Sequence, residues 1–151
     1  MHKHRNAPLD LGAVQQCHPG LDNAFVFQAL DPFPAGSAGS RIEGIGRSQV
    51  EASFQPDVID TMMKVADAAS IATILWLEQK TGRKAGASTG TNLWGVLQVA
   101  RGMQSRGESG SIVTLMCDSG ERYLDTYFNP AWVEKQIGDV QPYIDQLDAL
   151  F

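Results

Sequence analysis

Two short turns rich in small and polar residues are the parts of this chain best suited to chemistry. The first, Gly86-Ala-Ser-Thr-Gly-Thr91, precedes an amphipathic segment, and the second, Asp118-Ser-Gly-Glu-Arg122, follows an apolar run. Small residues let a backbone approach a ligand closely, and the free N–H groups of a helix N-terminus attract anions. Residues at the carboxyl ends of parallel strands face the ligand crevice of open α/β sheets. Together the turns predict a site for a small molecule or cofactor.

Each turn also has a purely structural interpretation. Ser88 or Thr89 is suited to cap the helix that follows, and Asp118 or Ser119 is suited to cap the turn after the apolar run. Cys117 is expected to be a buried structural cysteine, because the neighbouring carboxylate disfavours a thiolate. The three histidines lack a partnering carboxylate or cysteine pair, so no metal site is predicted.

Hydrophobic spacing and turn residues predict the elements that hold these turns. In order, they are a strand over 23–30, helices over 56–65, 68–80 and 89–105, a buried parallel strand over 112–116, and helices over 130–137 and 139–150. Residues 1–40 are expected to be a poorly defined N-terminal segment and linker, and residues 41–151 an α/β unit. Helices alternating with short buried strands indicate central parallel strands flanked by helices.

Several residues define these boundaries. Pro56 is expected to start the first helix, Asp67 to be the N-cap of the second, and Gly82 to end it. The buried face of the 89–105 helix is expected to consist of apolar residues at i, i+3, i+4 and i+7, namely Leu93, Val96, Leu97 and Ala100.

Composition narrows the classes of function. The chain has 151 residues, of which 43% are hydrophobic and 19% charged, and its net charge is −5. An acidic chain is a poor partner for nucleic acid or an anionic membrane, and no apolar run reaches the roughly 20 residues of a membrane span. Its two cysteines do not suggest a disulfide framework. We therefore expect a cytoplasmic protein with a small-molecule partner.

Three motifs taken in order resemble the C-terminal half of the cysteine synthase and cystathionine β-synthase family. They are Glu43-Gly-Ile-Gly46, Gly86-Ala-Ser-Thr-Gly-Thr91 and Asp118-Ser-Gly-Glu-Arg-Tyr-Leu124, and the resemblance covers about residues 41–128. The sequence Ser88-Thr-Gly-Thr-Asn-Leu-Trp-Gly95 is most similar to the corresponding sequence in a bacterial branch of the family that includes L-cysteine desulfhydrases.

The resemblance implies a cofactor and a fold. The cofactor is pyridoxal 5′-phosphate (PLP), and the fold is part of the three-layer, tryptophan synthase β-like arrangement of fold type II. Ser119 would donate a hydrogen bond to the pyridine nitrogen, and Gly44, Ile45 and Gly46 would line the cofactor edge. Ser88, Thr89, Gly90 and Thr91 would flank the ring and the substrate, a small amino acid. The implied reaction is β-elimination or β-replacement on cysteine or O-activated serine, and the family implies a homodimer.

Part of the family pattern is missing from this sequence. No lysine stands in the Ser-x-Lys context of the family's Schiff-base lysine; the five lysines are Lys3, Lys64, Lys80, Lys84 and Lys135. The Thr-Ser-Gly-Asn substrate loop and the Gly-Thr-Gly-Gly-Thr phosphate loop are also missing, as expected for a truncated or frame-altered gene product. We therefore expect no catalytic residue, weak or no PLP binding, and self-association through uncovered apolar surface. The alternative function is a non-catalytic α/β fragment or interaction module.

Overall fold

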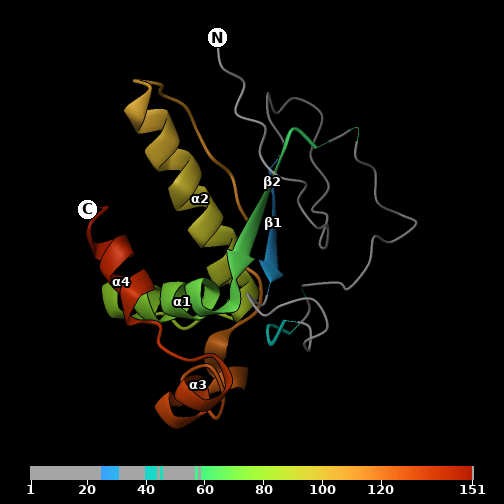
Figure 1. The fold of residues 1–151 in the computed structure, drawn as a ribbon, viewed down its shortest axis with the longest axis vertical. Helices are drawn as coiled ribbons and strands as arrows, with labels where there is room; N and C mark the ends of the chain where they lie inside the picture. Colours follow the sequence, from blue (N-terminus) through green and yellow to red (C-terminus); the bar gives the residue numbers. More distant parts are fainter. Residues whose placement is uncertain (1–24, 31–39, 44, 46–56, 58, 151) are drawn as a thin grey trace.

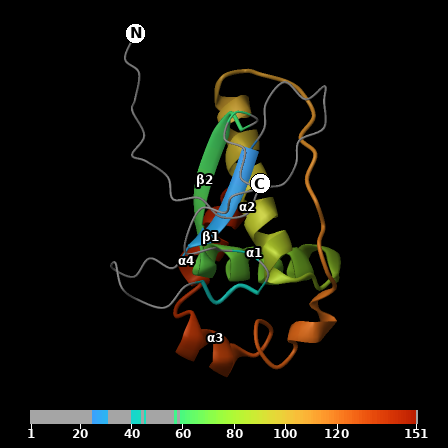
Figure 2. The same ribbon diagram turned by 90° about the vertical axis from the view of Figure 1, so that its right-hand side faces the viewer.

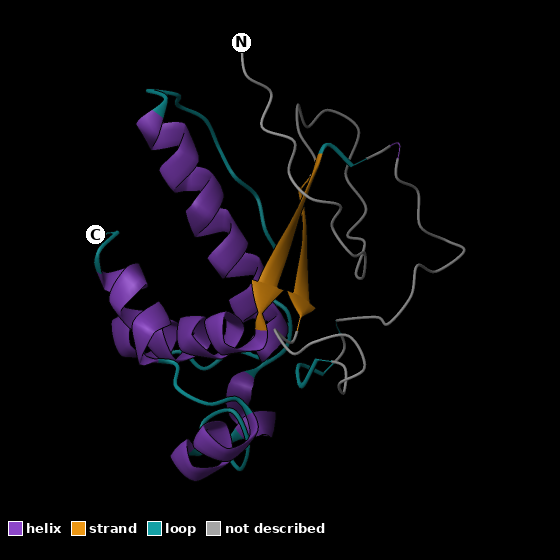
Figure 3. Ribbon diagram, viewed as in Figure 1, coloured by secondary structure: helices purple, strands orange, loops and turns teal. Residues whose placement is uncertain are grey.

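The computed structural model describes residues 25–30, 40–43, 45, 57 and 59–150, and all statements below concern these residues. Two strands lie beside a group of helices (Figure 1, Figure 3). The elements are β1 (Phe25–Leu30), β2 (Thr61–Ala66), α1 (Asp67–Thr81), α2 (Ala87–Ser105), the 3-10 helix η2 (Gly120–Tyr123), α3 (Pro130–Gln136) and α4 (Gln141–Asp148).

Strands β1 and β2 form a parallel pair, which runs in register from Phe25 opposite Thr61 to Leu30 opposite Ala66. The strand expected over 23–30 is confirmed for residues 25–30. Its pairing with β2 joins the segment before residue 40 to the segment after it. The helix expected over 56–65 is wrong, because β2 occupies its second half. Val65 is buried and Lys64 exposed, an alternation that suits a strand. Pairing with β1 therefore outweighs the signal from Pro56, which lies outside the described residues.

Helix α1 follows β2 without a loop, and every residue from Asp67 to Ile74 except Ala68 is buried. The N-cap is Ala66, which makes no side-chain capping bond, so the predicted capping role of Asp67 is wrong. Asp67 lies in the first turn instead, where its carboxylate accepts hydrogen bonds from Ser40 Oγ at 2.7 Å and from Arg41 N at 2.5 Å. The expected end of the helix is confirmed, since Gly82 adopts a left-handed conformation with φ of 71°.

Helix α2 crosses α1 at very short range. A Cβ at Gly90 would lie 2.1 Å from the Ser70 carbonyl oxygen, so only glycine permits this approach. The hydroxyl groups of Ser70 and Thr91 are 2.7 Å apart across the same crossing and are buried. The helix expected over 89–105 is confirmed as Ala87–Ser105, but small and polar residues rather than large apolar ones form its closest contact with α1.

The residues expected to form the apolar face of α2 are only partly buried. Trp94 is the large side chain that α2 buries, and its ring meets Tyr143 of α4 edge to face at a centroid distance of 5.5 Å. Two apolar clusters result. One contains Ile42, Ile71, Ile74, Ala87, Tyr123, Tyr127 and Val133, and the other Val65, Ala69, Trp94 and Leu147.

The buried central strand expected over 112–116 is wrong. This segment runs back along α2 as an extended stretch without strand pairing among the described residues (Figure 2). Val113, Leu115 and Met116 are exposed by 78%, 55% and 60%. Cys117 is exposed too, which corrects its expected burial. An apolar run becomes a central strand only when strands pair with both of its edges, and no described strand does so here.

The last two helices agree with expectation. Asn129 caps α3 by accepting a hydrogen bond from Ala131 N at 3.0 Å, and Pro130 stands at the first helical position. Helix α4 packs against α1. Within the described ranges, every helix is too short or too polar to cross a membrane.

Candidate functional site

Ser119 begins the turn that the sequence placed at the centre of the site. It is the N-cap of η2, and its Oγ accepts a hydrogen bond from Glu121 N at 3.3 Å. The side chain is exposed, and no acceptor for its hydroxyl proton is found among the described residues. The capping interpretation of Ser119 is therefore confirmed, and the hydroxyl proton stays available for a second hydrogen bond.

The Ser119 turn lies directly against the start of α2. Ala85 and Ser119 form an isolated antiparallel bridge, in which Gly86 N donates to Asp118 O at 3.0 Å and Gly120 N donates to Lys84 O at 3.2 Å. A Cβ at Gly86 would lie 2.0 Å from Asp118 Oδ1, so a larger residue here would have to displace the Asp118 side chain. Two turns that are about thirty residues apart in sequence are thus joined by their backbones.

The four residues Ser88 to Thr91 form the first turn of α2, and they face different neighbours. The cap of this helix is Gly86 without a side-chain bond, so the predicted capping by Ser88 or Thr89 is wrong. Thr89 Oγ1 instead accepts a hydrogen bond from Cys117 N at 2.9 Å, which ties the extended segment to α2. Gly90 and Thr91 face α1, and Ser88 is partly buried.

The glycine turn is described at Glu43 and Ile45, whereas Gly44 and Gly46 lie outside the described residues. Ile45 packs on the first apolar cluster, the one that also contains Tyr123 and Tyr127. The turn before it is held by Tyr127, whose hydroxyl accepts from Glu43 N at 3.0 Å and donates to Arg41 O at 3.2 Å. The described part of the glycine turn therefore shares its packing with the element that follows Ser119.

Two tyrosines complete this region, and sequence reasoning gave neither of them a role. Tyr123 donates to Asp118 Oδ2 at 2.7 Å, and this hydrogen bond, together with burial, raises the pKa of Tyr123 to about 12. Burial likewise raises the pKa of Tyr127. Tyr123 was visible in the Asp118–Leu124 motif, but the partners of Tyr127 are more than eighty residues away, so no local pattern could have revealed them.

The four lysines of the described region lie in different surroundings. Lys84 is next to Ser119 through the backbone bridge, but its Nζ forms an ion pair with Glu78. That hydrogen bond raises the pKa of Lys84, so it favours the charged form of the amine. Lys64, Lys80 and Lys135 are exposed on β2, α1 and α3.

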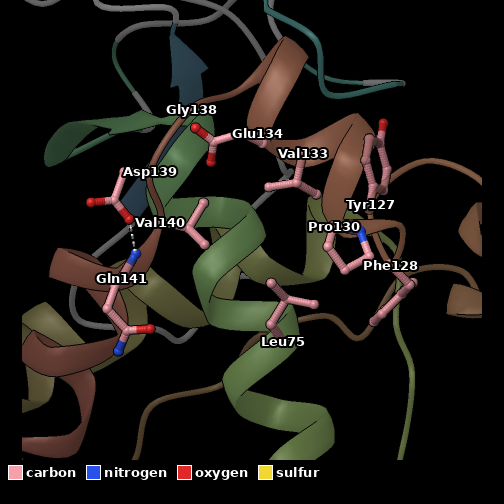
Figure 4. A pocket seen from close by; sticks show the side chains of 10 residues that line it. All are labelled: Leu75, Tyr127, Phe128, Pro130, Val133, Glu134, Gly138, Asp139, Val140 and Gln141. Atoms are coloured by element: carbon pink, nitrogen blue, oxygen red, sulfur yellow. Dashed lines mark hydrogen bonds between the residues drawn. The ribbon is translucent and has the colours of Figure 1, made fainter.

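A cavity of about 220 Å³ lies between α1, α3 and the segment before α4 (Figure 4). Apolar side chains such as Leu75, Phe128 and Val133 line it, with Glu134 and Asp139 also among its lining residues. None of the sequence-predicted site residues lines this cavity. Within the described part of the chain, no three histidine, cysteine or acidic side chains gather as a metal site would require.

Comparison with solved structures identifies the type of fold. The chain resembles the crystal structure of an O-ureido-L-serine synthase mutant with O-ureido-L-serine bound, with a TM-score of 0.51 and 20% sequence identity. The likeness covers 80% of this chain and 37% of that one. The fold is therefore a partial α/β fold of the type II PLP-dependent class.

Comparison with curated proteins identifies the family. The chain is 52% identical over 113 residues to L-cysteine desulfhydrase Cds1 of Mycobacterium tuberculosis, a match that covers 69% of this chain and 31% of that protein. It is 34% identical over 92 residues to cysteine synthase 2 of Emericella nidulans, covering 60% and 21%. No protein-family model matches. The chain belongs to the PLP-dependent cysteine synthase family, as a C-terminal portion of it, and it spans less than a third of these two relatives.

Proposed function

We propose that this chain is the C-terminal part of a PLP-dependent enzyme that carries out β-elimination or β-replacement on cysteine or O-activated serine. Among the comparisons, the 52% identity to a protein named L-cysteine desulfhydrase favours elimination from cysteine, with release of sulfide. The observation that carries the proposal is the exposed Ser119 hydroxyl on a turn fixed to the start of α2.

The chemistry of Ser119 fits the pyridine ring of the proposed cofactor. When bound, PLP supplies an electron sink for bond breaking at an amino-acid substrate. Ser119 would hold the ring by donating its proton to the pyridine nitrogen, while its oxygen keeps the bond from Glu121 N. A neutral hydroxyl does not force the ring nitrogen to be protonated, so it suits the loss of a β-substituent, which needs only a moderate electron sink.

Other residues of the region would shape the site without reacting. The backbone of residues 44–46 would line one edge of the cofactor, and Ser88 and Thr89 would lie on the side of the ring and the substrate. Gly90 and Thr91 would contribute by fixing the first turn of α2 on α1, since their neighbours are on that helix.

We further propose that the 151-residue chain alone does not catalyse this reaction. The lysine nearest Ser119 along the backbone bridge is Lys84, which is held protonated by Glu78. An amine that is paired and mostly protonated is a poor nucleophile for the imine by which PLP enzymes hold their cofactor. Without that bond and without a phosphate loop, PLP binding would be weak.

A second candidate function is a non-catalytic interaction module, and the extended segment favours it. Residues 111–116 carry no charge, and three of their large side chains are exposed. An unpaired, uncharged and apolar extended segment is a template for pairing with another strand. The partner proposed here is a second copy of the chain, whereas the whole enzyme is proposed to be a homodimer like its family.

A chimera tests the enzymatic proposal. The matching 113 residues of the mycobacterial desulfhydrase would be replaced by the corresponding residues of this chain. We expect the chimera to release sulfide from cysteine, and Ser119→Ala to lower the rate by about tenfold, the loss expected for one hydrogen bond to the cofactor. Ser111→Ala, at an exposed serine in the extended segment, is the matched control. A folded chimera that binds PLP but releases no sulfide would contradict the proposal.

A further inference from the structure

A pair of stacked tyrosines lies between the turns that the proposed function assigns to the cofactor. The rings of Tyr123 and Tyr127 are 4.6 Å apart at an interplanar angle of 25°. Tyr123 is exposed by 7% and Tyr127 by 2%. Trp132 of α3 meets the Tyr127 ring edge to face at 5.6 Å, which closes the stack on that side. Buried rings held in this way have little freedom to shift independently.

The two hydroxyl groups bind different turns. Tyr123 bonds to Asp118, which neighbours Ser119 and whose carbonyl accepts from Gly86 N. Tyr127 bonds to both Arg41 and Glu43, at the start of the glycine turn. A hydroxyl that donates one bond and accepts another has a fixed orientation. The stack therefore connects residues 41–43 to the Ser119 turn through two specific side-chain contacts.

A second contact strengthens the hold on residues 40–43. The carboxylate of Asp67, at the start of α1, accepts from Ser40 Oγ and Arg41 N, and Ile42 N donates to Ser40 Oγ at 3.0 Å. Ile42 is itself buried in the first apolar cluster. Residues 40–43 are thus bonded to Asp67 of α1, and Tyr127 connects them to the Ser119 turn.

We propose that Tyr123 and Tyr127 act together as a positioning pair, which sets the Ser119 turn in register with residues 41–43. The inference rests on the proposed function only where these turns are taken as two sides of one cofactor site. The pair does not touch the reacting atoms. Its role is to fix the Ser119 turn relative to the backbone of residues 41–43.

Amide hydrogen exchange on the full chain tests the coupling. Tyr127→Phe keeps the ring stack and removes both hydroxyl bonds, so we expect exchange at the Glu43 amide to rise by about fivefold, as the loss of one hydrogen bond implies. Because the rings are coupled, exchange at the Gly86 amide should rise as well. Tyr123→Phe should raise exchange at both amides as well, but more at Gly86 than at Glu43. In the double variant, the rise in exchange should be smaller than the sum of the rises in the two single variants.

Tyr143→Phe is the matched control, since Tyr143 also packs on an aromatic ring but lies on α4. It should leave exchange at Glu43 and Gly86 unchanged. If Tyr127→Phe affects Glu43 alone, or if the effects of the two substitutions simply add, the tyrosines are separate structural residues and the proposal is overturned.

A titration with PLP itself separates this inference from the proposed function. We expect PLP to shift the amide resonance of Ser119 in the wild-type chain, and Tyr127→Phe to weaken that response by about fivefold while Tyr143→Phe does not. If PLP shifts no resonance near Ser119 in the wild type, the cofactor site is refuted, but the exchange experiment still decides whether the tyrosines position the turns. If Tyr127→Phe leaves the PLP response unchanged, its role in positioning the site is overturned.

Discussion

Substituting Gly90 by alanine tests the crossing of α1 and α2, which supports the start of α2. A Cβ at this position would lie 2.1 Å from the Ser70 carbonyl oxygen and 2.9 Å from Ile74 Cγ2. The nearest atom belongs to the backbone of α1, so a change of rotamer cannot relieve the clash. The two helices would have to separate by about 1 Å to restore an ordinary contact.

Two opposing effects set the magnitude of the change. Alanine favours a helix over glycine by about 1 kcal/mol. Overpacking a core typically costs about 1–3 kcal/mol, and a backbone clash falls at or above the upper end of that range. Separation would also weaken the buried bond between Ser70 and Thr91, which contributes about 1 kcal/mol. We expect Gly90→Ala to lower the free energy of unfolding by about 2–3 kcal/mol.

Urea unfolding followed by circular dichroism measures this change, with Gly102→Ala as the control in the same helix. A Cβ at Gly102 would meet the Arg106 guanidinium at 3.2 Å, and that exposed side chain can move away. Gly102→Ala should therefore raise the free energy of unfolding by about 0.5–1 kcal/mol. If Gly90→Ala is neutral or stabilising, α1 and α2 do not cross as described, and the account of this end of α2 fails.

Two further predictions concern ionisation and self-association. The pKa of Tyr123 is raised from 10.0 to about 12, so its contribution to stability is fully present below pH 10 and is lost as the pH rises to about 12. In urea unfolding, Tyr123→Phe should reduce this loss of stability at alkaline pH. An unchanged loss would contradict the hydrogen bond to Asp118. The chain should self-associate in sedimentation velocity experiments. Val113→Lys should shift it toward monomer, whereas Leu124→Lys, at another exposed apolar residue, should not. Equal effects of the two substitutions would exclude the extended segment as the interface.

Helices α1 to α4 and the order of the motifs could be predicted from the sequence because their signals are local. Gly82 ends α1 and Pro130 begins α3 through their own backbone preferences. The family resemblance was also recognisable, because it depends on the residues and the order of short motifs. The comparisons confirm it.

The errors concern elements whose state depends on partners distant in sequence. Residues 61–66 pair with β1, which begins thirty-six positions earlier, and no local pattern announces that pairing. Residues 112–116 have the composition of a central strand, but the described structure offers them no neighbouring strand. Asp67 was predicted to cap its own helix, whereas its carboxylate accepts hydrogen bonds from Ser40 and Arg41. Local signals identify candidates, and tertiary contacts decide their state.

The interaction of the purified chain with PLP tests the central claim most directly. The chain would be mixed with PLP, its visible absorbance recorded, and the mixture treated with borohydride before peptide mapping, with sulfide release from cysteine measured in parallel. The account predicts no visible absorbance beyond that of free PLP, no single trapped lysine and no sulfide above a protein-free control. Its grounds are that Lys84 is paired with Glu78 and that no lysine of the sequence stands in a Ser-x-Lys context. Trapping of PLP on one specific lysine, with sulfide release abolished by Ser119→Asp, would contradict it.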